Sequence, residues 1–406
     1  MSTSLAQVGR GAVGPFALVG GLALGDRLVP GAIVIVDGRI EEVLLGSRSG
    51  NLPSTRYAAP IIAPGLIDLQ VNGGFGQEVG VDPAAIAHLA ARLPATGVTA
   101  FLPTMISSPA AAYPPLFAAF ADFAAATNAA GASPLGLHLE GPFLSSARKG
   151  AHPLAAIEAA DDHLFSVLLG ESAVRLMTLA PERPGAPRRI ASLCGRGVLV
   201  SLGHTDATTE EFLAGIEAGA RMATHLFNAM TPFNHRAPGA VGAALTDDRV
   251  TIGLIADGVH AHPVALRLAL RAKGPERVAL VTDMMSAAGM PPGQYRLGPQ
   301  TVTVDAGSAR LADGTLAGSI LTLDQAVRNL VAWLGIGSAV ALRMATEVPA
   351  RLLGLRSRGL LSRGHRADLT LWSDNLDLLA TIIGGAFVHG NATSFAAPIL
   401  PIFEES

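Results

Sequence analysis

The chain has 406 residues, of which half are apolar and 15% are charged, and its formal net charge at pH 7 is −3. This composition suits a protein that buries a large core and excludes a disordered chain. The near-neutral charge, without any Lys/Arg run longer than two, argues against nucleic acid or an anionic membrane as a partner.

Cysteine content and hydropathy predict a cytoplasmic protein without a membrane partner. Cys194 is the only cysteine, so the chain can form neither an internal disulfide nor a cysteine-rich zinc site. Any metal must then be held by histidine and carboxylate side chains. Residues 13–24 are apolar but interrupted by Pro15, Gly20 and Gly21, which is not typical of a signal peptide. No uninterrupted apolar stretch reaches the ~18 residues that would span a bilayer.

Both ends of the chain are predicted to form short strands. Residues 31–46, GAIVIVDGRIEEVLLG, place β-branched residues around an Asp37-Gly38 turn. Residues 366–390 contain RADLTLWSD and ATIIGGAFVHG, which alternate apolar with polar positions and turn at a glycine pair. We therefore expect the termini to meet in a small β-sandwich domain made of residues 1–58 and 358–406.

Between these ends, eight apolar runs recur, and helical patterns separate most of them. The first two are IIAPGLIDL (61–69) and VTAFLP (98–103), followed between residues 135 and 283 by LGLHLEG, VRLMTLAP, GVLVSLGH, ARMATHLF, VTIGLIAD and VALVTD. Their spacing of roughly 20 to 40 residues predicts an α/β fold, a (β/α)₈ TIM-like barrel, over residues 59–357.

Polar side chains end most of these runs, and in such barrels the chemistry lies at the C-terminal ends of the strands. They are Asp68, Gln70, Asn72, His138, Glu140, His204, His225, Asp257, His260 and Asp283. Glu140, His204 and His225 offer one carboxylate oxygen and two imidazole nitrogens, a common catalytic zinc set that leaves a position for water. Alternatively, each histidine is a hydrogen-bonded core residue. Three such groups on different strand ends, flanked by glycine, favour the metal site.

Asp283 closes the last run, where a carboxylate can exchange a proton with water that zinc has acidified to a pKa of ~7. Local sequence supports equally an Asp that caps the following helix. His138 shares a strand face with Glu140 and is expected to support the metal site from below. His152 and His260 lie in predicted loops, where each contacts either substrate or solvent.

The segment HLFNAMTPFNHRAPG, residues 225–239, is too polar and too rich in glycine and proline for a core segment. It is predicted to be a loop between a strand and a helix. Backbone N–H groups around Asn228 and Ala229 could cradle an anion, which Arg236 could pair with bidentately. Alternatively, Arg236 is a solvated loop charge.

Several of these motifs together carry a resemblance to a known family. They are APGLIDLQVNGGFG, GLHLEGPFLS followed by KGAHP, SLGHTDAT, THLFNAMTPFNHRAPG, IADGVHAHP, LVTDMMSAAG and LADGTLAGSILTLDQAV. In this order and spacing, they make the chain resemble N-acetylglucosamine-6-phosphate deacetylases of the amidohydrolase superfamily over nearly its whole length. The resemblance implies a hydrolase that cleaves a linear amide and releases acetate and glucosamine 6-phosphate, using metal-activated water and Asp283 as the acid/base.

The resemblance also implies one metal ion per chain. The superfamily usually has a His-x-His pair after the first strand, which holds one of two metals, and here Gln70 and Asn72 occupy those positions. Amides are poor zinc ligands, which points to a single-metal branch with Glu140, His204 and His225 as ligands. Zn²⁺ is expected, although the same ligands accept Fe²⁺, Co²⁺ or Mn²⁺.

For the substrate, the resemblance implies that His152 contacts the sugar and acetamide, with Gln70 and Asn72 also in the substrate-binding set. The phosphate site would comprise Asn228, Ala229, Arg236 and His260. In the family the last two often come from the neighbouring subunit, which implies a homodimer.

Two other functions remain open at this stage. One is another amidohydrolase, such as an N-acyl-amino-acid deacylase or a cyclic-amide hydrolase, from which Arg236 and the FNAM stretch distinguish this chain. The other is a non-catalytic barrel, which would be expected to lose ligands or the catalytic Asp, whereas all are present here. The sequence does not fix which N-acetylhexosamine 6-phosphate is preferred.

Overall fold

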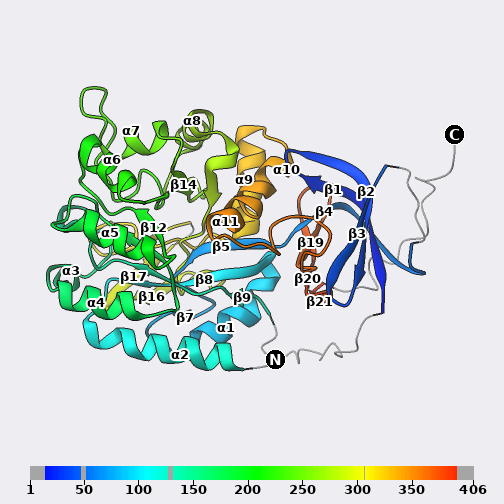
Figure 1. Cartoon of the computed structure of the whole chain (residues 1–406), viewed down its shortest axis with the longest axis horizontal. Coiled ribbons are helices and arrows are strands. Elements are labelled where there is room, and N and C mark those ends of the chain that lie inside the picture. Colours follow the sequence, from blue (N-terminus) through cyan, green and yellow to red (C-terminus); the bar gives the residue numbers. More distant parts are fainter. Residues whose placement is uncertain (1–13, 47–51, 127–130, 306, 391–406) are drawn as a thin grey trace.

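The two ends of the chain meet in one sheet beside the main body of the protein (Figure 1). The computed structural model describes residues 14–46, 52–126, 131–305 and 307–390. The seven strands of this terminal sheet are β1 (Phe16–Leu24), β2 (Arg27–Val36), β3 (Arg39–Leu45), β4 (Thr55–Pro64), β19 (Leu369–Trp372), β20 (Leu378–Ile383) and β21 (Ala386–His389). Their order is β21-β20-β19-β4-β1-β2-β3. β4 joins the two ends because it pairs with β1 on one side and with β19 on the other.

The terminal sheet forms where the sequence predicted it. Asp37 and Gly38 connect β2 to β3 with φ values of 48° and 73°, the left-handed conformation that tight hairpin turns require. Strands from both ends share an apolar cluster separate from that of the barrel, with Phe16, Ile33 and Leu371 among its members. The exact limits of this domain, residues 1–58 and 358–406, stay a prediction. Residues 1–13, 47–51 and 391–406 of that prediction lie outside the described residues.

The main body is a barrel of eight parallel strands, which confirms the predicted fold class. They are β5 (Leu66–Val71), β8 (Val98–Ile106), β10 (Leu137–Glu140), β11 (Val174–Leu179), β12 (Leu199–Leu202), β13 (Met222–Ala223), β14 (Thr251–Leu254) and β15 (Val278–Leu280). Each pairs with its successor in the chain, and β9 (Ser133–Pro134) adds to β8. Every predicted run overlaps one barrel strand, and the first run also includes the end of β4. These strands are almost wholly buried, so they appear in the sequence as continuous apolar runs.

Backbone and side-chain hydrogen bonds join the last strand to the first just beyond their ends. The Asp283 N–H donates to the Gln70 carbonyl over 3.0 Å, and the Asn72 N–H donates to the Met284 carbonyl over 2.9 Å. Below them, the Thr282 hydroxyl donates to Asp68 Oδ2 over 2.6 Å. Asp68 is fully buried, and burial raises its pKa to about 6. Asp68 therefore helps to close the barrel.

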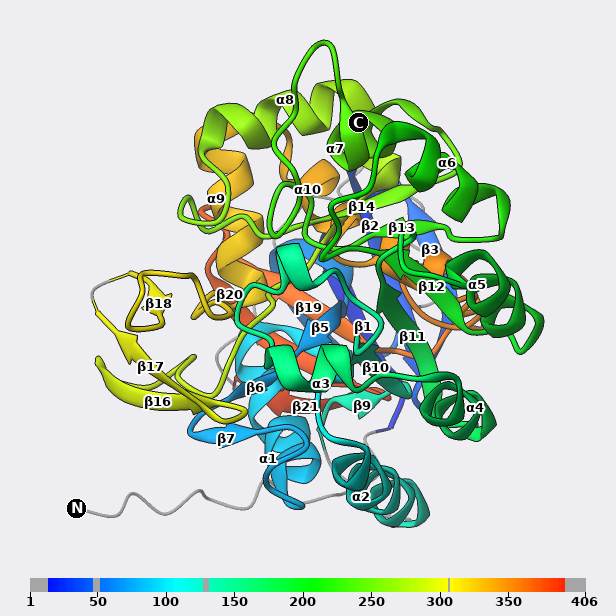
Figure 2. The ribbon, with the colours of Figure 1, turned by 90° about the vertical axis from the view of Figure 1, so that its left-hand side faces the viewer.

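Helices surround the barrel (Figure 2). They are α1 (Ala85–Arg92), α2 (Tyr113–Ala125), α3 (Leu154–Glu158), α4 (Asp162–Gly170), α5 (Ala186–Gly195), α6 (Thr209–Glu217), α7 (Gly239–Thr246), α8 (Pro263–Lys273), α9 (Leu323–Leu334), α10 (Ser338–Met344) and α11 (Glu347–Leu352). A capping box between Thr208 and Glu211 starts α6 directly after the loop that carries His204. Among the described helices, none is both long and apolar enough to span a bilayer.

A small antiparallel sheet between β15 and α9 was not predicted. It comprises β16 (Gly293–Leu297), β17 (Gln300–Val304) and β18 (Ala309–Arg310), and Figure 2 shows it beside the barrel. Leu297 and Val302 belong to an apolar cluster of its own, which also includes Met285 and Ala151 from loops at the barrel mouth. The sheet therefore packs against the loops that build the site.

Candidate active site

A cavity of about 360 Å³ opens at the C-terminal ends of the barrel strands. The predicted site residues that line it are Asn72, Glu140, His152, His204, His225, Asn228, Ala229, His260 and Asp283. Gln70 is buried beside them and bonds to two of them. Arg236 is exposed and does not line the cavity of its own chain. The barrel thus brings together all the predicted residues except Arg236.

Three buried side chains converge at the floor of this cavity. Glu140 Oε1 lies 3.1 Å from His225 Nε2 and 3.4 Å from His204 Nε2. The two Nε2 atoms are 3.1 Å apart. A cation bound tetrahedrally at ~2.0–2.1 Å would hold its ligand atoms about 3.4 Å apart. The three groups therefore have the spacing and the chemistry to hold a divalent cation.

His152 also lies close to this cluster, because ligand atoms of Glu140, His152 and His204 lie within 4.8 Å of one another. However, the Ser107 backbone N–H donates to His152 Nδ1 over 3.1 Å. A neutral His152 must then carry its proton on Nε2, which lies 3.6 Å from Glu140 Oε2. A protonated nitrogen has no lone pair for a metal. His152 is therefore a hydrogen-bond donor at the edge of the cluster.

The two other histidines differ in their electrostatics. His204 Nδ1 donates to the Arg148 carbonyl over 3.0 Å, which leaves its Nε2 lone pair facing the cluster. Burial, and then the neighbouring His152, lower the pKa of His204 to about 4. Burial also lowers the pKa of His225, but the Glu140 carboxylate outweighs it and the net pKa is raised.

The side-chain amide of Gln70 links Asp283 to Glu140, and that of Asn72 holds Asp283 as well. Gln70 Nε2 donates to Glu140 Oε1 over 2.8 Å and to Asp283 Oδ1 over 2.9 Å. Asn72 Nδ2 donates to the same Asp283 Oδ1 over 2.6 Å. No described residue donates to Asp283 Oδ2. Burial, and then the Glu140 carboxylate, raise the pKa of Asp283 to about 7. This carboxyl group can therefore both take up and release a proton near neutral pH.

The backbone turns sharply where it delivers three of these side chains. His204, His225 and Asp283 have φ values of 48°, 25° and 52°. Residues other than glycine rarely adopt this left-handed conformation, which costs roughly 1–3 kcal/mol at each position. Such strain persists where surrounding contacts fix the backbone, as the bond from the Asp283 N–H to Gln70 does here. Strained backbone of this kind is concentrated at functional sites.

Another part of the cavity lining is polar and comes from two loops. His260 Nδ1 lies 2.6 Å from Asp257 Oδ2, which orients the imidazole, and His260 lines the cavity together with Asn228 and Ala229. Ala229 has φ 50°, so the loop around it is tightly curved. Asp257 thus orients another residue and does not line the cavity itself.

Three residues at the site were not predicted from the sequence. Arg148 and Arg310 line the cavity, and Ser107 fixes the tautomer of His152. Arg148 directly precedes the KGAHP motif and Arg310 directly precedes LADGT, so their place beside motifs was the only available signal. His138 packs beneath the site as expected, because its Nδ1 donates to the Leu69 carbonyl over 3.1 Å.

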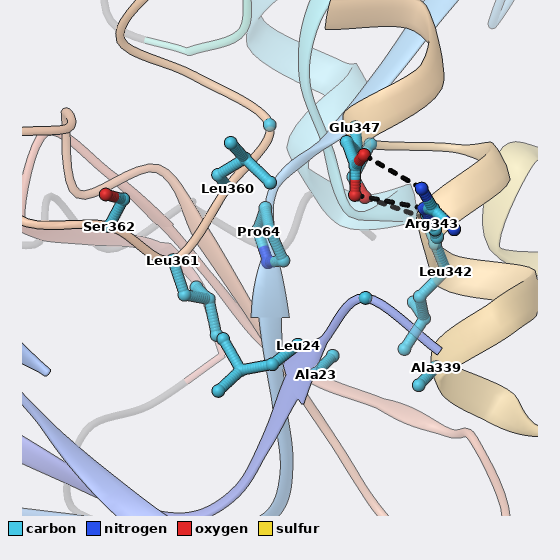
Figure 3. A pocket seen from close by; sticks show the side chains of 13 residues that line it. Ala23, Leu24, Pro64, Ala339, Leu342, Arg343, Glu347, Leu360, Leu361 and Ser362 are labelled. Atoms are coloured by element: carbon cyan, nitrogen blue, oxygen red, sulfur yellow. Dashed lines mark hydrogen bonds and ion pairs between the residues drawn. The ribbon is translucent and has the colours of Figure 1, made fainter. Parts of the chain in front are cut away.

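A second cavity, of about 190 Å³, lies where the terminal sheet meets α10 and α11 (Figure 3). Its lining is mostly aliphatic, with Leu24, Leu342 and Leu361 among its residues. Its two charged side chains, Arg343 and Glu347, bond to each other over 3.0 and 3.1 Å. The two charged groups of this lining are thus paired with each other, and none of the predicted site residues lies in it.

The chain is similar to characterised proteins over most of its length. The sequence profile of the amidohydrolase family matches residues 61–388. N-acetylglucosamine-6-phosphate deacetylase of Homo sapiens is 42% identical over 347 residues, covering 81% of this chain and 83% of that protein. N-acetylgalactosamine-6-phosphate deacetylase of Escherichia coli O157:H7 is 40% identical over 339 residues, covering 82% of this chain and 88% of that protein.

A solved structure is similar in both sequence and fold. It is an N-acetyl-D-glucosamine-6-phosphate deacetylase of Mycobacterium smegmatis, determined as a mutant in complex with N-acetyl-D-glucosamine-6-phosphate. It is 35% identical, has a TM-score of 0.84, and covers 93% of this chain and 100% of its own.

Proposed function

Because this chain belongs to the amidohydrolase family, which hydrolyses amide C–N bonds, we propose that it deacetylates N-acetylglucosamine 6-phosphate to glucosamine 6-phosphate and acetate. The observation that carries the proposal is the convergence of Glu140, His204 and His225 beside Asp283 in one cavity. The names of the similar proteins support the deacetylase activity and the phosphorylated amino sugar as substrate.

We assign Glu140, His204 and His225 as ligands of one divalent cation per chain. Zn²⁺ is the cation we propose. Their spacing of 3.1 to 3.4 Å and their donor types support this assignment. When bound, such a cation supplies Lewis-acid polarisation of a carbonyl and lowers the pKa of water toward ~7. Gln70 Nε2 bonds to the Glu140 oxygen of this cluster and holds the carboxylate in place.

Asp283 is the proposed proton carrier. Gln70 and Asn72 both donate to its Oδ1, so Oδ2 is the atom free to exchange a proton. It would take a proton from the attacking water and return it to the sugar nitrogen, because an amine leaves far more readily than its anion. The pKa of about 7 suits a group that must act as both base and acid.

His152 is proposed to donate from Nε2 to the acetamide oxygen as negative charge develops there. The Ser107 N–H fixes the required tautomer, and the side chain is buried, so little water competes for the bond. A pre-oriented donor of this kind stabilises the transition state more than the ground state.

For the phosphate we propose Asn228, Ala229 and His260 from one chain and Arg236 from a second copy. The resemblance implied that His260 also comes from the neighbouring subunit, whereas it lines the cavity of its own chain. Arg236 is exposed outside its own cavity, and Phe233, three residues before it, is 57% exposed. On α8, Val264 and Leu268 are 65% and 57% exposed. Apolar side chains this exposed favour an interface, which supports a homodimer.

Acetate release from N-acetylglucosamine 6-phosphate tests the proposal, with the metal content measured on the same sample. We expect turnover and about one cation per chain. Metal-replete protein that releases no acetate from any N-acetylhexosamine 6-phosphate would refute the activity. The galactosamine isomer is a second candidate, because a relative at 40% identity bears that name. Glucosamine, galactosamine and mannosamine substrates compared by kcat/KM decide between them.

Mixing two impaired variants, assayed at substrate well below KM, tests the shared phosphate site. In a heterodimer of Arg236→Ala and Asp283→Asn chains, the cavity of the Arg236→Ala chain has an intact Asp283 and receives an intact Arg236 from its partner. We therefore expect kcat/KM to rise on mixing. Activity that stays at the level of the two separate variants would contradict an Arg236 supplied across an interface.

A further inference from the structure

A fully buried side-chain oxygen in the cavity lining, Asn72 Oδ1, has no hydrogen-bond partner among the described residues. Asn72 is 2% exposed and lines the cavity, yet its Oδ1 accepts no hydrogen bond from any described residue. The side chain cannot resolve this by rotating its amide, because Nδ2 donates to Asp283 Oδ1 over 2.6 Å. Exchanging the two atoms would set two oxygens against each other. A buried acceptor left unsatisfied costs roughly 1–3 kcal/mol, so an acceptor at such a site fits a donor on the substrate.

We propose that Asn72 Oδ1 accepts the hydrogen bond from the N–H of the substrate's acetamido group. This inference rests on the proposed deacetylase function and names the atom that recognises the amide nitrogen. An acetamido group brings one N–H donor and one carbonyl acceptor into the cavity. The carbonyl oxygen is already matched with His152 Nε2. The N–H needs a separate acceptor.

Other acceptors at the floor of the cavity are committed elsewhere. Asp283 Oδ1 already accepts from Gln70 and Asn72, and Asp283 Oδ2 must remain free to exchange the proton. Glu140 Oε1 belongs to the metal cluster, and Glu140 Oε2 faces His152 Nε2 at 3.6 Å. His225 Nδ1 also lacks a partner among the described residues, but it carries the ring proton when Nε2 offers its lone pair, so it is a donor.

The position of Asn72 also explains how the proton reaches the leaving group. The same amide that would hold the substrate N–H is bonded to Asp283, so the substrate nitrogen is held within reach of Asp283 Oδ2. When the C–N bond breaks, its electron pair goes to nitrogen and the proton moves from Oδ2 to that nitrogen. The sugar leaves as a neutral amine, and the acyl carbon keeps the hydroxyl of the attacking water as acetic acid, whose remaining proton passes to the released amine or to solvent and leaves acetate. Asp283 returns to its carboxylate form.

A contact to the N–H makes the site selective for amides over esters. An oxygen ester has the same carbonyl but no N–H, so it leaves Asn72 Oδ1 unpaired, and sites built to bond an N–H discriminate against analogues that lack it. The matched substrates are N-acetylglucosamine 6-phosphate and the 2-O-acetyl ester of glucose 6-phosphate. The measured quantity is the ratio of their kcat/KM values, which cancels effects common to both.

Two variants separate substrate contact from support of Asp283. Asn72→Leu removes both the donor and the acceptor, and we expect the amide-to-ester ratio to fall about 10- to 100-fold. Asn72→Asp keeps an oxygen for the N–H while removing the donor to Asp283. Both rates should then fall, with the ratio within about threefold of wild type.

Equal losses on both substrates in Asn72→Leu would overturn the inference, because they would show that Asn72 acts only through Asp283. If Asn72→Leu turns over neither substrate, substrate affinity is measured instead of turnover. Amide and ester are titrated onto Asp283→Asn protein with and without Asn72→Leu, and an unchanged ratio of Kd values overturns the inference. A wild-type enzyme that hydrolyses neither substrate refutes the deacetylase function instead.

Discussion

Replacing Asp283 by Asn tests the proton carrier with little change in shape. The new side chain keeps an oxygen that can accept from Gln70 and Asn72, now 2.9 and 2.6 Å from Oδ1, and it places an amide nitrogen where Oδ2 stood. Burial already disfavours the charged carboxylate, as its pKa of about 7 shows, so neutralising it should not destabilise the fold. We expect an unchanged or higher unfolding temperature and an unchanged metal content.

Turnover should respond very differently. General acid–base catalysis by one side chain contributes roughly 10²- to 10⁴-fold to the rate. We therefore expect kcat for acetate release to fall by roughly 10²-fold or more. KM should change little, because Oδ2 exchanges a proton and need not bind the ground-state substrate. The assay is steady-state acetate release with metal content measured in parallel. Near-normal kcat in metal-loaded Asp283→Asn protein would remove Asp283 from the mechanism.

Four further outcomes are expected. Asp68→Asn tests barrel closure: the folded pKa of Asp68, about 6, lies above its unfolded value, so wild-type stability is lost as pH rises from about 4 to 6. In chemical denaturation, the variant should gain about 2–3 kcal/mol relative to wild type between pH 4 and 7, and a pH-independent difference would exclude the raised pKa. His152→Asn should lower kcat roughly 10²- to 10³-fold with metal content intact, whereas metal loss would make His152 a ligand. Arg236→Ala should raise KM for the 6-phosphate about tenfold or more and scarcely affect a non-phosphorylated analogue, and equal losses on both would argue against a phosphate contact. Removing the metal with a chelator should abolish acetate release and lower the unfolding temperature, both restored by Zn²⁺, while full activity in metal-free protein would rule out the proposed role of the cation.

The barrel could be predicted from sequence because its strands are buried on both faces. Buried parallel strands appear as separate apolar runs, and a barrel places the ends of all of them at one mouth. Glu140, His204 and His225 are far apart in the chain, so only this topology predicted that they meet. The Asp37-Gly38 hairpin was predictable for a local reason, because its turn needs left-handed backbone.

Other features depend on three-dimensional contacts that leave no pattern in the sequence. Ser107 acts on His152 through its backbone N–H, and any residue type supplies that group. Asp68 and Asp283 both come at the end of an apolar stretch of sequence. Asp68 lies within β5 and closes the barrel, whereas Asp283 lies beyond β15 and lines the cavity, a difference set by the neighbours of each carboxylate. The strands β16 to β18 are short and partly exposed, so they lack the long apolar run that marked the barrel strands. For Arg236 and His260 the resemblance implied a place in a neighbouring subunit's site, but only the folded chain separates the two: His260 lines the cavity of its own chain and Arg236 does not.

An anomalous-scattering map of zinc-loaded crystals measures the arrangement on which the whole account depends. We predict a single peak per chain, within roughly 2.0–2.2 Å of Glu140 Oε1, His204 Nε2 and His225 Nε2, with His152 Nε2 outside bonding distance. Two peaks, or one peak coordinated by His152 in place of His225, would contradict the proposed metal site.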